Sequence, residues 1–194
     1  MKNEKRGFAV ASGVALLLYG ALLGAAALIF SFLGPFSLGS ALAVSYYLLP
    51  AIAGIFLIRQ ECKPAAILMT LTAVAILLLE IPEIPQYLAP EGFLVDTNAA
   101  TGVSEYLPRS FVALPILQIL AVAFFAVGLW LRGWGVLVLT ALAAGAELAS
   151  MGLRLASFRY VSGEPTAIDL VFPAFFALGA VLAGLYLFSL GEKG

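Results

Sequence analysis

Histidine is absent from this chain of 194 residues, and cysteine occurs only once, at Cys62. The absence of histidine excludes histidine-ligated haem and zinc, and it excludes every Ser-His or Cys-His catalytic mechanism. A single cysteine excludes an intramolecular disulfide and any thiol-pair redox chemistry within one chain. The chemistry of carboxylates, lysines and tyrosines remains open.

Charged residues are scarce at 11% of the chain, whereas hydrophobic residues make up 63%. A soluble domain typically has about 25% charged and about 45–50% apolar residues. Such a chain cannot cover a water-facing surface with polar groups, but a surface in contact with lipid needs no such cover. We therefore predict an all-α fold, a polytopic transmembrane helical bundle that occupies residues 1–194 as a single domain in the cell membrane.

Sequence motifs that would indicate a particular chemistry are also missing. The chain has no Walker A loop, dinucleotide fingerprint, Asp-rich pyrophosphate motif, regularly spaced calcium loop or basic patch for nucleic acid. We therefore expect no nucleic-acid partner, no cofactor and no metal site. Catalysis is disfavoured, although an enzyme acting on a lipid is kept as an alternative.

Long apolar runs predict the transmembrane spans, because about 20 apolar residues cross the hydrocarbon core. The expected spans are six, at about 7–33, 41–58, 64–80, 111–131, 134–159 and 167–190, with one long outer loop at 81–110. The first run follows a basic stretch, but it is too long for the apolar part of a signal peptide, about 7–15 residues. We interpret it as an uncleaved helix.

Basic residues predict the orientation of the bundle, because they concentrate on the cytoplasmic side. With the N-terminus in the cytoplasm, seven of the ten basic residues lie inside: Lys2, Lys5, Arg6, Arg59, Lys63, Arg132 and Lys193. Six spans then place both termini in the cytoplasm. The fifth span is the least secure because its outer half carries charge. If it were only interfacial, the C-terminus would lie outside.

The fifth span carries the strongest candidate site. Glu147, Ser150 and Arg154 follow one another at i, i+3 and i+7, which puts them on one helix face at about 100° per residue. A carboxylate this deep in the hydrocarbon region is expensive, so it should face protein or a water-filled cavity. Gln118 in the fourth span is placed to hydrogen-bond Glu147 across a helix interface, and Tyr46 and Tyr47 are weaker candidates.

Two interpretations of this polar face remain open. In the functional one, the face lines an outward-facing pocket in which Arg154 attracts an anionic group and Glu147 closes the pocket or relays a proton. In the structural one, Arg154 pairs with an outer acid such as Asp169, Glu164 or Glu105, and Glu147 is a buried polar group of the packing.

Two further features concern helix packing. Small residues at Gly20 and Gly24 let helix backbones approach closely, so this face predicts packing either within the protein or against a partner membrane subunit. Pro50 lies nearest the centre of a span and is the best candidate for a hinge, since proline removes a helical hydrogen bond.

In size, in number of spans and in the placement of both termini, the predicted architecture is similar to the substrate-binding subunits of energy-coupling-factor vitamin transporters. No residue motif carries this similarity. It implies binding of a solute on the outer side, under loops, and association with a transporter partner. The first hypothesis is accordingly small-solute binding or transport in the lipid bilayer. The alternatives are a non-catalytic membrane scaffold and, third, a lipid-modifying membrane enzyme.

Overall fold

A computed structural model describes residues 2–33, 37–97, 104–160 and 164–191. Six helices in these ranges are long and apolar enough to cross a membrane. They are α1 (Lys2–Leu33), α2 (Leu38–Ile58), α3 (Cys62–Glu80), α5 (Ala113–Trp130), α6 (Trp134–Ser157) and α7 (Ala167–Gly191). The predicted all-α bundle of six long apolar helices is confirmed, and the chain is a multi-pass membrane protein.

The helix ends differ from the apolar runs by a few residues, and local polar groups explain the differences. α2 begins at Leu38 because Ser37 and Ser40 form a capping box, in which each side chain accepts a hydrogen bond from the backbone N–H of the other residue. α6 ends at Ser157 instead of continuing to 159. The Ser157 hydroxyl donates to the carbonyl of Arg154 at 2.7 Å, and Phe158 forms the C-cap.

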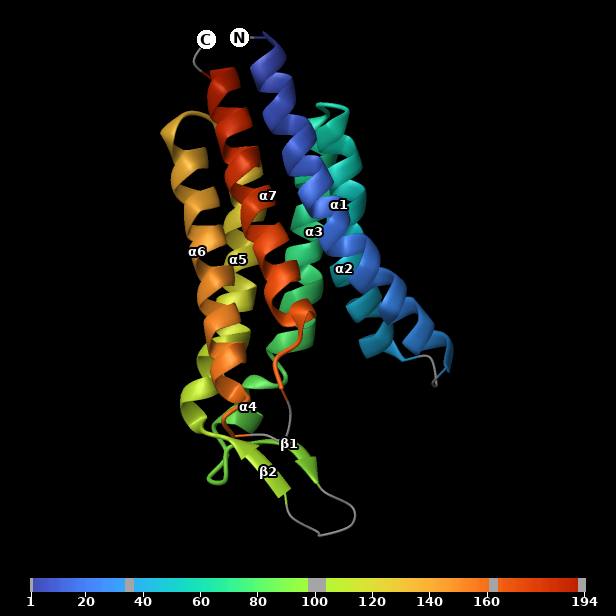
Figure 1. Ribbon diagram of the computed structural model, residues 1–194, viewed down its shortest axis with the longest axis vertical. Helices are drawn as coiled ribbons and strands as arrows, with labels where there is room; N and C mark the ends of the chain where they lie inside the picture. Colours follow the sequence, from blue (N-terminus) through green and yellow to red (C-terminus); the bar gives the residue numbers. More distant parts are fainter. Residues whose placement is uncertain (1, 34–36, 98–103, 161–163, 192–194) are drawn as a thin grey trace.

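The six long helices form a ring in which each helix packs against two principal neighbours, in the order α1, α2, α3, α5, α6 and α7 (Figure 1). The contact between α1 and α7 closes the ring, and there the buried Ser12 hydroxyl donates to the Gly179 carbonyl at 2.8 Å. The interior is filled with apolar side chains, the largest fully buried ones being Phe125, Phe176, Leu16, Leu57, Met69 and Ile76.

The ring divides into two halves of three helices each, α1–α3 and α5–α7. Because each half contains an odd number of spans, the second half begins at the end where the first one finishes and runs in the opposite sense (Figure 1). The start of α1 and the end of α7 lie together at one end, here called the terminus end, where the Lys5 ammonium donates to the Ser189 carbonyl.

Large apolar side chains cover the outside of the ring. Leu71 on α3, Leu142 on α6 and Leu178 on α7 are each about half exposed. A soluble monomer rarely exposes apolar surface on so many faces, whereas lipid solvates it.

The segment predicted as a long outer loop contains secondary structure and lies at the opposite end of the bundle, here called the cap end (Figure 1). It contains the short helix α4 (Ile84–Tyr87) and an antiparallel pair of strands, β1 (Phe93–Thr97) and β2 (Ser104–Leu107). Neither strand was predicted from the sequence. The Tyr87 ring stacks on Phe93 with centroids 4.2 Å apart, and a small apolar cluster around Tyr87 reaches Ala156 of α6.

The face at Gly20 and Gly24 packs within the chain. A Cβ atom at Gly20 would overlap the backbone carbonyl oxygen of Tyr47, and one at Gly24 would overlap the Leu48 side chain, so both glycines allow α1 to approach α2 closely. Of the two uses expected for this face, the structure shows the internal one. A partner membrane subunit at this face stays a prediction.

Candidate functional site

The polar face of α6 lies inside the ring. Glu147 is 4% exposed and lies about 20 Å along the helix from Trp134, while Arg154 is half-buried one turn before the end of α6. Ser150 is buried between them. Gln118, on the neighbouring helix α5, is also buried.

A cavity of about 50 Å³ brings three of the four predicted residues together. Glu147, Gln118 and Arg154 line it, whereas Ser150 is buried outside its wall. The rest of the wall comes from α1, α2 and α7: Tyr19, Leu23, Tyr46, Tyr47, Ile168, Phe172 and Pro173. The cavity therefore lies between the two halves of the ring, with polar groups contributed by both.

Tyrosines supply the part of the site that the sequence analysis missed or underrated. The Tyr19 hydroxyl donates to the Tyr46 hydroxyl at 2.9 Å, and both side chains are buried. Tyr47 lies beside them, 4.7 Å from Tyr46 between ring centroids. Tyr19 was not predicted, although its depth in an apolar span was a signal, because transmembrane tyrosines concentrate at the membrane interfaces.

The carboxyl group of Glu147 is the most unusual group of the site. Its Oε2 atom is buried and, in the part of the chain that the structure describes, has no hydrogen-bond partner. An unpaired buried carboxylate is strongly disfavoured. The Oε2 atom therefore needs a bound proton, a cation or a hydrogen-bond donor from a ligand.

Arg154 supplies positive potential to the same region. It is close enough to interact electrostatically with Glu147, Glu80 and Asp169. Asp169 is already engaged at the start of α7, where one of its carboxylate oxygens accepts hydrogen bonds from the backbone N–H and the hydroxyl of Thr166, at 2.8 and 2.7 Å. Arg154 thus interacts electrostatically with acids from several elements, and not with Glu147 alone.

The size of the cavity limits what it can hold in this conformation. One water molecule has a share of about 30 Å³ in the liquid, and pockets for drug-sized ligands span about 300–1,000 Å³. The cavity of about 50 Å³ therefore has room for water or a small ion. A vitamin-sized solute, as the similarity in architecture implied, would require the two halves to separate.

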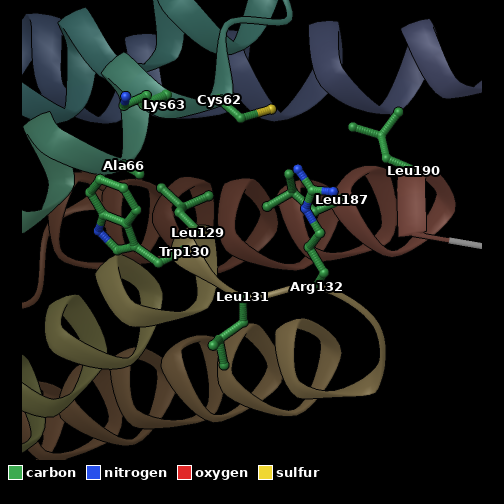
Figure 2. A pocket seen from close by; sticks show the side chains of 9 residues that line it. All are labelled: Cys62, Lys63, Ala66, Leu129, Trp130, Leu131, Arg132, Leu187 and Leu190. Carbon is green, nitrogen blue, oxygen red and sulfur yellow. The ribbon is translucent and has the colours of Figure 1, made fainter. Parts of the chain in front are cut away.

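A second and larger cavity, of about 360 Å³, opens at the terminus end between α3, the end of α5 and α7 (Figure 2). Its wall contains Lys63 and Arg132 and none of the predicted site residues. The two cavities thus lie toward opposite ends of the boundary between the two halves.

Comparisons of the chain with protein-family models, with curated proteins and with solved structures find no significant match.

Proposed function

We propose that this multi-pass membrane protein binds or transports a small polar solute, and that the cavity at Glu147, Gln118 and Arg154 is its binding site. The observation that carries the proposal is the buried, unpartnered Oε2 of Glu147 at a cavity wall. Buried polar groups in membranes are normally satisfied by the protein, so an unsatisfied one at a cavity is a position for a ligand or proton.

The residues around the cavity have complementary roles. Glu147 accepts a proton or the donor group of the solute. Gln118 and the tyrosine hydroxyls supply neutral donors and acceptors, which orient a solute without adding charge. Arg154 lies closer to the cap end and attracts anionic groups entering from that side.

The position of the Glu147 cavity between the two halves supports transport, since transporters commonly bind solutes at an interface between groups of helices near the middle of the membrane. An aromatic layer from α1, α5 and α7 lies along these helices between the residues that line the two cavities. Phe176 makes edge-on contacts with Tyr19 and Phe125, with centroids 5.2 and 5.6 Å away. Rearrangement of this layer would connect the Glu147 site to the terminus end.

The proposal is tested in liposomes containing the purified protein and an entrapped pH-sensitive dye. Glycine, short carboxylates, ammonium, sodium and potassium are added separately, and flux and internal pH are followed. Ammonia and protonated short carboxylic acids cross protein-free bilayers, so rates are compared with those in protein-free liposomes. We expect at least one probe to be taken up with a pH change that exceeds this background. Glu147→Gln should abolish the pH change, and Arg154→Gln should weaken uptake of an anionic probe by about 10- to 100-fold, which corresponds to one hydrogen bond to a charged group.

Glu164→Gln and Arg159→Gln are matched controls, because both residues are exposed near the cap end and neither lines the cavity. They should behave like the unmodified protein. If the Glu147 and Arg154 variants gave the same uptake and the same pH change as these controls for every probe, the polar face would serve helix packing and not solute binding. The scaffold alternative would then be favoured.

A further inference from the structure

The cavity at the terminus end combines positive charge with an apolar wall. Lys63 lies in the first turn of α3, and Arg132 lies in the connection between α5 and α6. Figure 2 shows the Arg132 side chain extending toward Cys62 across the gap between α3 and α7. The remaining wall is mostly apolar: Ala66, Leu129, Trp130, Leu131, Leu187 and Leu190.

The positive charge of this wall has no acidic side chain within the described part of the wall to balance it. Among its described residues the wall has two cations and no acid, and Glu61, which precedes α3, is not part of it. Lys63 comes from the first turn of a helix and Arg132 from a connection between helices, both at the end of the bundle where the chain leaves the apolar region. A ligand with an anionic group and an apolar part would therefore meet two positive groups and an apolar wall in one cavity.

Tryptophans place this rim at the level of a membrane interface. The Trp130 ring lies on the wall and donates its indole N–H to Thr70 of α3 at 3.0 Å, while Trp134 is 74% exposed beside the same connection. Tryptophan concentrates where hydrocarbon meets the headgroups. The cavity thus has its cations at headgroup depth, together with Leu131 and Leu190, while Ala66, Leu129 and Leu187 lie further into their helices.

We propose that this cavity is a binding site for an anionic phospholipid, with its phosphate held by Lys63 and Arg132 and an acyl chain against Ala66, Leu129 and Leu187. Basic pockets between helices on the cytoplasmic side are suited to such headgroups. A free phosphate would use the cations but leave the apolar wall without a partner, so a membrane lipid fits the whole cavity better. This proposal does not depend on the function assigned to the Glu147 site.

The test uses Trp130 as a reporter. The chain has two tryptophans, so Trp134→Phe leaves Trp130 as the single tryptophan, which is excited selectively over the tyrosines at the long-wavelength edge. This variant is placed in phosphatidylcholine vesicles containing a small fraction of either brominated phosphatidylglycerol or brominated phosphatidylcholine. We expect stronger quenching by the anionic lipid, and we expect Lys63→Gln with Arg132→Gln to reduce this preference about 30-fold, the electrostatic contribution of two basic residues at an anionic surface.

Arg6→Gln with Arg59→Gln is the matched control, since it removes two exposed charges from the same end outside the cavity. It should preserve the preference. Equal quenching by both brominated lipids would overturn the proposal, and so would an equal loss of preference in the control. Displacement of the brominated anionic lipid by millimolar inorganic phosphate would assign the cations to a soluble anion and also overturn it.

The single cysteine provides a second measurement without any substitution. Cys62 lines the cavity, and its sulfur lies toward the gap in Figure 2. Alkylation of Cys62 by a water-soluble maleimide should be slower in phosphatidylglycerol nanodiscs than in phosphatidylcholine nanodiscs. This difference should disappear in the Lys63 and Arg132 double variant. Equal rates in both lipids for the unmodified protein would contradict occupation of the cavity.

Discussion

Glu147 carries a carboxyl group that is buried deep in the bundle. A charged side chain at the centre of a membrane helix costs about 2.5–3.5 kcal/mol on insertion scales. The helices around Glu147 offset part of this cost through the positive potential of Arg154 and the polar groups of Gln118 and the tyrosines. These groups do not satisfy the Oε2 atom, which has no hydrogen-bond partner among the described residues.

The backbones of α1 and α2 approach so closely at Gly20 that the packing there has no room for an added methyl group. Gly20→Ala would force its Cβ atom against the Tyr47 carbonyl and the Ala51 backbone, neither of which can swing away. Overpacking of this kind costs about 1–3 kcal/mol. We expect the variant to unfold at a lower temperature in detergent, as measured by tryptophan fluorescence during heating.

Gly145→Ala is the control for this prediction. No atom lies within 4 Å of the position that its Cβ would occupy, and alanine is favoured over glycine within a helix by about 1 kcal/mol. Gly145→Ala should leave the melting temperature unchanged or raise it. Equal destabilisation by the two substitutions would show that α1 and α2 do not touch at Gly20.

The cap at the end of the bundle shows how a polar segment gains structure from its neighbours. Gly92 turns the chain into β1 with a positive φ of 92°, and a Cβ atom there would overlap the Leu107 carbonyl. Tyr87, Leu107 and Phe111 then form a small buried cluster. The cap therefore has a core of its own, although a two-stranded sheet alone is marginally stable in water.

Titration of Tyr87 tests the burial of this cap. Burial, followed by the charge of Glu83 and Glu80, raises the pKa of Tyr87 to about 12, from an ordinary value near 10. Since the fold favours the neutral phenol, its contribution to stability is fully present below pH 10 and is lost as the pH rises toward 12. The ultraviolet difference spectrum between the unmodified protein and Tyr87→Phe should therefore show tyrosinate forming near pH 12.

The phenylalanine variant keeps the ring that stacks on Phe93, so the comparison isolates the hydroxyl group. A difference spectrum with a midpoint near pH 10 would mean that Tyr87 is in water and that the cap does not fold on α6.

The whole molecule is a ring of two oppositely oriented halves, with a cavity toward each end of their boundary. The two cavities are therefore separated along the long axis of the bundle. The Glu147 site lies nearer the cap end, and the basic cavity lies at the terminus end. A change in the contact between the halves would affect both cavities, because each is lined by helices from both.

The orientation of the whole bundle in the membrane is tested by labelling. In a Cys62→Ser background, Arg59→Cys marks the terminus end and Glu91→Cys marks the cap end, since both positions are exposed. With the terminus end in the cytoplasm, an impermeant maleimide should label Arg59→Cys only in inside-out vesicles and Glu91→Cys only in right-side-out vesicles. The reverse pattern would overturn the predicted orientation, and labelling of both positions from one side would contradict an odd number of spans between them.

Properties that depend on local composition and helical period were predictable from the sequence. The membrane class and the six helices follow from transfer free energies summed over neighbouring residues. The common face of Glu147 and Arg154 follows from the helical period, and both residues line one cavity. The strands of the cap were missed because their pairing joins Phe93 to Leu107 across residues with no clear strand pattern.

Only the tertiary structure decided which distant residues meet. Tyr19 joins Tyr46 and Glu147 at one cavity because α1 closes the ring between α2 and α7, and nothing in the sequence around Tyr19 specifies those neighbours. The same packing places Gly20 against α2 and puts Lys63 and Arg132 on the wall of one cavity. Local sequence sets which face of a helix is polar or small, whereas the position of that face in the molecule depends on contacts between helices far apart in the chain.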